Sequence, residues 1–402
     1  MLDLKKQFPW FSNNPDYVYM DSGATTLKPK CVIDSIVNYY EKWGTNPHNT
    51  DSAFTNHTHN LVENIRIKLA NLINAKKDEI IFNSGATEGL NMIANSICED
   101  LIPGDEIILT YGEHASNILP WMQNAQKKGL IIKYVGDKNR LPTPNDYYSI
   151  LSPRTKVVSF ASGFNLTGER LDETQICNIV KKYNDNIFVV VDATQSIQHR
   201  KIDVKLSNID YLVCSAHKMF GPTGVGMVYI KESLISQTLP IRYGGGMNFS
   251  IDLQSYQLMD GYMKFEGGTQ NVAGIIGWGA AIDFLNNIGY PNIRSHEIEL
   301  SNYAHKLLST IPNIIIYNEG NDSPTIAFNY KDVFCQDLAS YLGKKKIIVR
   351  SGLSCAKLFC NIIDTKALIR CSFYIYNTKE DIDKLYQVLL EFKKGDEIDV
   401  IF

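Results

Sequence analysis

Short apolar runs that alternate with helical patterns constrain the fold more than any other feature of this 402-residue sequence. The runs lie at 79–82, 106–110, 130–135, 155–161, 186–193, 210–216 and 224–230. Apolar strands separated by helices are typical of βα units, which form a mostly parallel sheet covered on both faces. The last two runs lie too close together for a crossover helix, so we expect an antiparallel strand there.

The pattern changes near residue 266, where helices and short strands begin to alternate differently. Helical patterns follow at 272–288, 291–310, 334–343 and 378–393, with short strands between the later ones. These elements indicate a smaller α/β domain. We therefore predict an α/β protein with a large domain at 1–265 and a small domain at 266–402. The N-terminal segment of the large domain is expected to be able to pack on the small one.

Charge and cysteine content argue against several classes of function. The net charge is −3, so nothing favours nucleic acid or an anionic membrane as a partner. No apolar run is long enough to span a bilayer, and the first residues resemble neither a signal nor a transit peptide. The eight cysteines include no CxxC pair, which argues against a disulfide framework or a zinc site. We expect a cytoplasmic protein without a metal.

Three polar groups follow strands in chain order. Asp192 ends an apolar strand, at the edge of the sheet where α/β proteins bind ligands. Lys218 follows another such strand and has glycine-rich flanks. Ser84–Thr87 joins a strand to a helix start, which suits a phosphate. Taken singly, each is better explained by an ordinary structural role, namely a helix cap or ion pair for Asp192, a surface lysine for Lys218 and an N-cap for Ser84–Thr87. Together they supply the carboxylate, the amine and the phosphate cradle of a pyridoxal-phosphate site.

Nine segments spread over the chain carry a family resemblance. They are YMDSGATTLKP (19–29), GATEGLN (85–91), EHASNILPW (113–121), VDATQS (191–196), HKMFGPTGVG (217–226), YGGGM (243–247), FEGGTQN (265–271), RSGLSCA (350–356) and RCSFYIYNTKEDID (370–383). In these segments the sequence resembles the class V aminotransferases. Within them it is similar to the cysteine desulfurases of the branch that includes the Suf-system enzyme and selenocysteine lyase. The resemblance implies an aspartate-aminotransferase-like fold and pyridoxal 5'-phosphate as cofactor.

The resemblance also implies roles for single residues around the cofactor. Lys218 would carry the cofactor as a Schiff base, and Asp192 would pair with the ring nitrogen. His114 would stack on the ring and take part in proton transfer, and Gln195 would bind the ring hydroxyl. The phosphate would be bound by Ala86, Thr87, Ser215 and His217, together with Thr269 of the partner subunit, which implies a homodimer.

For the substrate, the resemblance implies L-cysteine. Asn165 and Arg370 would hold its carboxylate, and Cys355 would take its sulfur as a persulfide. Arg350 is the candidate cation for lowering the pKa of that thiol. The sulfur would pass to an acceptor or scaffold protein of the Suf type, for iron–sulfur clusters or thiolation. Without the resemblance, a core histidine, an interdomain ion pair and a buried thiol explain His114, Arg370 and Cys355 equally well.

The sequence departs from the family pattern near the nucleophile. Leu353 and Ser354 stand where the family usually has two histidines, and the usual proline after the cysteine is absent. The stretch His48–Ser52 also lacks an arginine and a histidine of the family's pattern. These changes surround the substrate and not the cofactor. Selenocysteine lyase, another class V lyase or aminotransferase, and a non-enzymatic assembly subunit therefore stay as alternatives.

Overall fold

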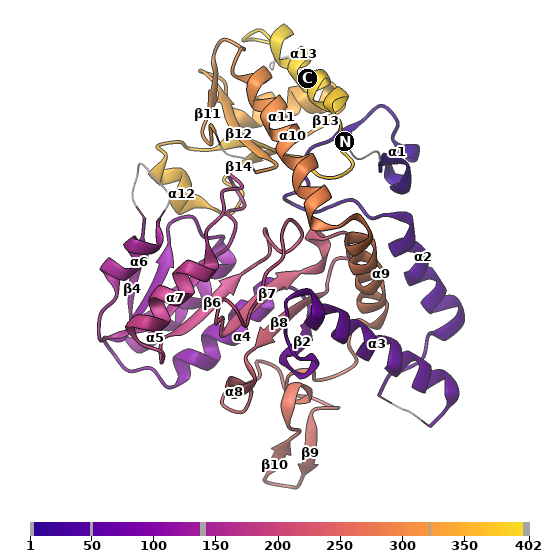
Figure 1. Ribbon diagram of the computed structural model, residues 1–402, viewed down its shortest axis with the longest axis vertical. Helices are drawn as coiled ribbons and strands as arrows, with labels where there is room; N and C mark the ends of the chain where they lie inside the picture. The colour runs from indigo at the N-terminus through magenta and orange to yellow at the C-terminus, as the bar shows by residue number, and fades with distance from the viewer. Residues whose placement is uncertain (1–3, 49–50, 137–141, 321–322, 397–402) are drawn as a thin grey trace.

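The computed structural model describes residues 4–48, 51–136, 142–320 and 323–396, and it is built around one large and one smaller sheet (Figure 1). The departure at His48–Ser52 lies in part outside the described residues, since 49 and 50 are not among them. None of the described helices is long and apolar enough to cross a membrane.

Seven strands form the central sheet in the order β2-β8-β7-β6-β5-β3-β4. Their bounds are Ile80–Asn83 (β2), Glu106–Thr110 (β3), Ile131–Val135 (β4), Thr155–Ala161 (β5), Phe188–Asp192 (β6), Tyr211–Ser215 (β7) and Gly226–Ile230 (β8). Strands β7, β6, β5, β3 and β4 pair in parallel, and β8 is antiparallel to both β7 and β2. The mostly parallel sheet and its antiparallel strand are therefore as predicted.

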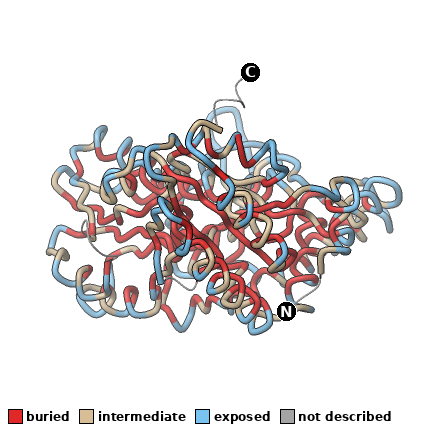
Figure 2. Tube along the Cα trace, turned by 90° about the horizontal axis from the view of Figure 1, so that it is seen from above, coloured by how far each residue is buried: buried red, intermediate tan, exposed pale blue. Residues whose placement is uncertain are grey.

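Helices cover both faces of this sheet because each buried strand alternates its side chains between two cores. Val189 and Val191 belong to one core and Val190 to the other. The first core includes residues of α2 (Lys30–Asn38), α3 (Ala53–Leu72), α6 (Pro144–Ile150), α7 (Glu173–Tyr183) and α9 (Val272–Ile288). The second includes residues of α4 (Ala86–Glu99), α5 (Leu119–Lys128) and α8 (Glu232–Ile235). Figure 2 shows these buried strands running through the middle of the molecule.

The smaller sheet has the order β11-β12-β15-β14, with antiparallel neighbours throughout. Its strands and the helices between and beside them are α10 (Tyr290–Leu308), β11 (Ile314–Ile316), β12 (Thr325–Tyr330), α11 (Cys335–Lys344), β14 (Arg350–Gly352), α12 (Lys357–Ile362), β15 (Leu368–Ser372) and α13 (Lys379–Glu391). Leu300, Ile326, Leu338 and Leu385 share its separate core.

Two further pairs of strands connect or extend the main layers. The N-terminal strand β1 (Val18–Tyr19), which follows α1 (Pro9–Asn13), pairs in parallel with β13 (Ile347–Ile348) beside the smaller sheet. The hairpin of β9 (Asn248–Ile251) and β10 (Tyr256–Leu258) projects away from the body (Figure 1). The division into domains at 1–265 and 266–402 stays a prediction.

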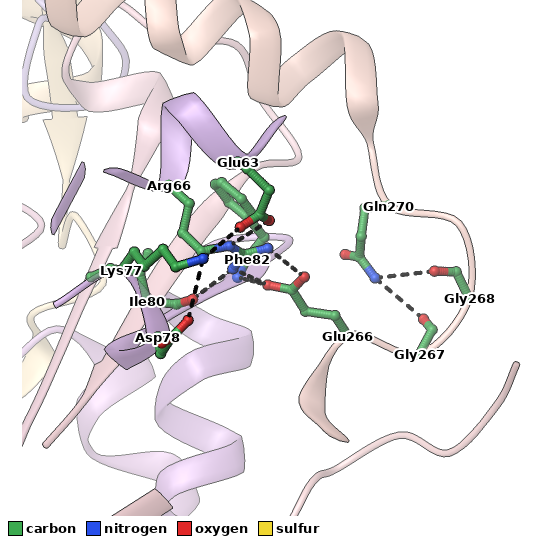
Figure 3. Close-up of polar contacts among 10 residues, drawn as sticks. All are labelled: Glu63, Arg66, Lys77, Asp78, Ile80, Phe82, Glu266, Gly267, Gly268 and Gln270. Carbon is green, nitrogen blue, oxygen red and sulfur yellow. Dashed lines mark hydrogen bonds and ion pairs between the residues drawn. The ribbon is translucent and has the colours of Figure 1, made fainter. Parts of the chain in front are cut away.

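A buried ion pair joins α3 to the segment that leads into α9 (Figure 3). Arg66 donates to both carboxylate oxygens of Glu266, at 2.7 and 2.9 Å, and also to Glu63 at 3.0 Å. Glu266 in turn accepts from the backbone N–H of Phe82 in β2 at 2.6 Å. Arg66 is 1% exposed and Glu266 is 8% exposed. The pair therefore ties the loop that contains Thr269 to the edge of the central sheet.

We predict that Glu266→Gln lowers the free energy of unfolding by about 3–5 kcal/mol, because it leaves the Arg66 charge buried without its main partner. Asp283→Asn is the matched control. Asp283, in α9, pairs with Lys68 of α3, the helix that also carries Arg66, but the Asp283 side chain is half exposed. We expect that control to cost less than about 1 kcal/mol. Urea denaturation measures both values. Equal losses in the two variants would contradict the role given to the buried pair.

Candidate active site

A cavity of about 290 Å³ opens where the carboxyl ends of β3, β5, β6 and β7 meet. Parallel strands end at a common edge, so groups that follow them come together. The predicted residues that line this cavity are Ala86, Thr87, His114, Asn165, Asp192, Gln195, Ser215, His217, Lys218, Cys355 and Arg370. Thr269 does not line it and is exposed in the loop that follows Gly268.

Lys218 ends a short turn, Ala216–Lys218, that directly follows β7. Burial and, after it, the charge of Arg370 lower the pKa of its amine to about 8, against the opposite effect of Asp192 and Asp21. A lysine with such a pKa has a substantial fraction of free amine near neutral pH. It can therefore act as a nucleophile or as a base.

Asp192 and Gln195 face the same cavity from the end of β6. Asp192 is buried, and its Oδ1 accepts from the backbone N–H of Thr194 at 3.0 Å. The amide of Gln195 donates to the carbonyl of Gly23 at 2.8 Å, which fixes the direction of its side chain. A buried carboxylate at this edge is suited to a cationic or proton-donating partner.

His114 lies in the turn after β3 and is held in a defined orientation. Its Nδ1 accepts from the backbone N–H of Ser116 at 3.1 Å, so the proton of the neutral ring is on Nε2. Burial lowers its pKa, as do Lys218 and Arg370, against the effect of Asp192. The neighbouring Glu113 is fully buried, and burial raises its pKa to about 7. Because the pKa of His114 itself is lowered, its ring is neutral near pH 7.

The start of α4 forms one end of the cavity. Gly85 precedes this helix with φ of 144°, a conformation that favours glycine, and as the N-cap residue it has no side chain to cap the helix. Free N–H groups at such a helix start attract anions. Ser215 Oγ accepts from the Ala86 N–H at 2.9 Å, and Thr87 bonds to Ser116 at 2.8 Å. Burial lowers the pKa of His217, at the same end, to about 4, with the charges of Lys218 and Lys28 as further causes.

Cys355 reaches the cavity from the loop between β14 and α12, and its side chain is exposed. Ser354 and Cys355 both have left-handed backbone conformations, with φ of 45° and 59°. Two hydrogen bonds from the central layer hold this loop. The Asn165 amide donates to the Ser354 carbonyl at 2.6 Å, and the Ala115 N–H donates to the Cys355 carbonyl at 2.9 Å. Cys214, Cys360 and Cys371 are buried, as predicted.

Arg370, in the middle of β15, is 2% exposed and yet lines the cavity. Its guanidinium donates to the Asn165 carbonyl and to Asp21 Oδ1, each at 2.8 Å. Burial raises the pKa of Asp21, with Arg370 acting against it. The sequence analysis gave no role to Asp21, although its motif YMDSGATTLKP was the available signal. Gly23 and Ala24 of that motif also line the cavity, as does Arg350.

Several polar atoms around the cavity have no hydrogen-bond partner among the described residues. They are Asn165 Oδ1, Thr194 Oγ1, His217 Nδ1 and Arg370 Nε. Buried polar atoms usually have partners, so such a group indicates a place for a polar ligand. The uncapped helix start and the low pKa of Lys218 fit a ligand that has both an anionic group and a group that reacts with amines.

The sequence and the fold were compared with those of known proteins. The model of the aminotransferase class-V family matches residues 18–385. A probable cysteine desulfurase of Ureaplasma parvum is 56% identical over 401 residues, with all of both chains covered. The cysteine desulfurase of Thermococcus onnurineus, solved in its apo form, aligns with a TM-score of 0.92 at 30% identity and covers 98% of both chains. The cysteine desulfurase CsdA of Escherichia coli aligns with a TM-score of 0.89 at 30% identity and covers 96% of both. The chain therefore belongs to the class V aminotransferase family.

Proposed function

We propose that this chain is a pyridoxal-phosphate-dependent cysteine desulfurase, which converts L-cysteine to L-alanine and takes the sulfur onto Cys355 as a persulfide. One observation carries the proposal. The Lys218 amine and the Cys355 thiol, 137 positions apart in the sequence, face one cavity together with the Arg370 guanidinium. A lyase that releases the heteroatom directly would have no use for a cysteine at this place. Relatives that cover the whole chain and are named cysteine desulfurases support the same reaction.

The residues of the cavity fit the cofactor. The uncapped start of α4, Ser215 and the unpartnered His217 Nδ1 would hold its phosphate. Asp192 would hold the ring nitrogen, Gln195 the ring hydroxyl and His114 the ring face. Pyridoxal phosphate, when bound, supplies an electron sink for the charge that is left when a proton leaves the substrate's α-carbon.

The chain's own residues would handle the substrate and its protons. Arg370 and Asn165 would bind the substrate carboxylate, and the Arg370 Nε–H, which has no partner among the described residues, is free to donate to it. Lys218, as a free amine, would take the α-proton, because its pKa of about 8 makes it a base near neutral pH. His114 is the second candidate for proton transfer, through its Nε2.

Sulfur transfer would then need the thiolate of Cys355. This thiolate attacks the substrate sulfur and forms an S–S bond. The carbon–sulfur bond of the substrate breaks, and its electron pair stays on the carbon, which takes up a proton and leaves as alanine. Arg350 lines the same cavity as this thiol.

The proposal extends to partners and location. A homodimer would bring Thr269 of the partner subunit to the phosphate, and Thr269 is exposed here as that role requires. The projecting β9–β10 hairpin has exposed apolar side chains that a second copy would cover, namely Phe249, Ile251, Leu253 and Tyr256. An acceptor or scaffold protein of the Suf type would collect the sulfur, for iron–sulfur clusters or thiolation, in the cytoplasm.

We predict that the purified protein, given L-cysteine and a reductant, forms alanine and sulfide in equal amounts. Cys355→Ala should lower both at least about a hundredfold, because no nucleophile then receives the sulfur. Cys31→Ala is the matched control, since Cys31 is also exposed but lies outside the cavity. Chromatographic assay of alanine and colorimetric assay of sulfide measure the two products. Full alanine formation by Cys355→Ala would indicate a direct lyase instead, and none from the cofactor-loaded wild type would rule out the substrate.

We further predict how pH governs the attachment of pyridoxal phosphate to Lys218 in cofactor-free protein. The rate constant should rise with pH, with a midpoint near the pKa of about 8, and level off at higher pH, where the amine is fully free. Arg370→Met should move this midpoint upward, because the removed positive charge is one cause of the lowered pKa. Arg154→Met, an exposed arginine outside the cavity, should leave it unchanged. Stopped-flow absorbance measures the rate. A midpoint that Arg370→Met does not move would contradict this account.

A further inference from the structure

The segment Thr25–Lys28 belongs to the motif YMDSGATTLKP, yet the proposed reaction gives it no role. It does not line the cavity, whereas Gly23 and Ala24 just before it do. The side chains of Thr25, Thr26 and Lys28 instead contact the backbone of the Ala216–Lys218 turn.

Four donors from this segment converge on one acceptor, the carbonyl oxygen of His217. They are the Thr26 N–H at 3.0 Å, Thr25 Oγ1 at 3.1 Å, Thr26 Oγ1 at 3.1 Å and Lys28 Nζ at 3.0 Å. Thr26 Oγ1 also accepts from the Phe220 N–H at 2.8 Å, so its own hydrogen is directed to the carbonyl. A carbonyl oxygen has two lone pairs, so the four donors share them. Together they restrict the direction in which the His217 carbonyl can point.

Lys28 holds this position with neutral acceptors. Its ammonium donates to the Thr26 carbonyl at 2.6 Å, to the His217 carbonyl and to Thr25 Oγ1 at 3.4 Å. Burial alone lowers its pKa to about 7, so keeping a charge here is costly. A hydrogen bond from a charged donor is roughly twice as strong as a neutral one. The cost of burying the charge and the strength of its hydrogen bonds both indicate a specific role for Lys28.

The carbonyl in question belongs to the peptide that joins His217 to Lys218. This peptide connects the Cα atom of His217, at the phosphate end, to the Cα atom of Lys218, so holding its plane fixes the backbone from which both side chains start. The turn has no side-chain cap of its own. Among its other backbone bonds, the Ala216 N–H donates to the Val225 carbonyl, and the Met219 and Gly221 N–H groups donate to the Ala216 carbonyl, so none of these three involves the His217 carbonyl.

We infer that Thr25, Thr26 and Lys28 are positioning residues, which hold the His217–Lys218 peptide plane so that the Lys218 amine meets the cofactor in a reactive geometry. This inference rests on the part of the proposed function that makes Lys218 the attachment point. It is independent of the substrate and of sulfur transfer.

The test measures attachment of pyridoxal phosphate to cofactor-free protein in the absence of cysteine, so a wrong substrate does not affect it. Lys28→Met keeps the length of the side chain and removes the ammonium. Its attachment rate constant should fall at least about tenfold, since a small misplacement of a reacting group costs this much. Lys30→Met, two residues further on, is the control, because Lys30 is exposed and pairs with Asp34. It should react as the wild type does.

Substitutions of Thr26 separate positioning from packing. Thr26→Val keeps the volume and removes the hydroxyl, whereas Thr26→Ser keeps the hydroxyl and loses a buried methyl group. If Thr26 acts by positioning, Thr26→Val slows the attachment of pyridoxal phosphate about tenfold, and Thr26→Ser reacts at close to the wild-type rate. Equal slowing by both, in proportion to the loss of melting temperature, would overturn the inference. So would unchanged rates in folded Lys28→Met and Thr26→Val.

Pyridoxal, which lacks the phosphate, distinguishes positioning from a simple effect of charge. If Lys28 positions Lys218, then Lys28→Met slows the reaction with pyridoxal by the same factor as the reaction with pyridoxal phosphate. If Lys28 serves only to attract the phosphate, then the reaction with pyridoxal is unaffected, and the inference is wrong. In the loaded enzyme, positioning lowers kcat for L-cysteine and leaves KM within about twofold of the wild type.

Discussion

The common direction of the strands in the central sheet determines where the reactive groups of this protein lie. Strands β3, β5, β6 and β7 all end at one edge, and there the chain carries His114, Asn165, Asp192 and Lys218 into one cavity. The reversed strand β8 starts at the same edge, with Gly226 paired to both Ser215 and Asn83. A Cβ atom at Gly226 would lie 2.5 Å from the Cα of Gly85, so only glycine permits this approach. The phosphate end of the cavity therefore depends on the same sheet as the lysine.

The loop of Cys355 shows how the smaller sheet takes part in a site that is built mainly on the larger one. Two consecutive residues in left-handed conformations cost about 1–3 kcal/mol each. The bonds from Asn165 and Ala115 offset part of this cost. Leu353, in place of a family histidine, packs against the buried cluster that contains Cys360. An apolar contact of Leu353 therefore also holds this loop.

Much of this arrangement could be predicted from the sequence, because strand periodicity and motif order are local properties. The strand ends that carry Asp192 and Lys218 were found in this way, and so were helices α9, α10, α11 and α13, whereas the short helix α12 was missed. The pairs Arg370–Asp21 and Arg66–Glu266 could not be predicted, since 349 and 200 positions separate their members and a single sequence does not say which charges meet. The β9–β10 hairpin was also missed. Phe249, Ile251 and Leu253 alternate there with polar residues, which was the available signal for a strand.

The charges around Lys218 bear on the order of events in the proposed reaction. Arg370 is, after burial, the largest cause of the lowered pKa of Lys218, even though Asp21 already pairs with this arginine. The lowered pKa favours a free amine in the protein without substrate. A substrate carboxylate bound to Arg370 would offset its positive charge and so raise the pKa of Lys218. On the proposed roles, the lysine becomes a stronger base when the substrate is in place, which is when it has to accept the α-proton.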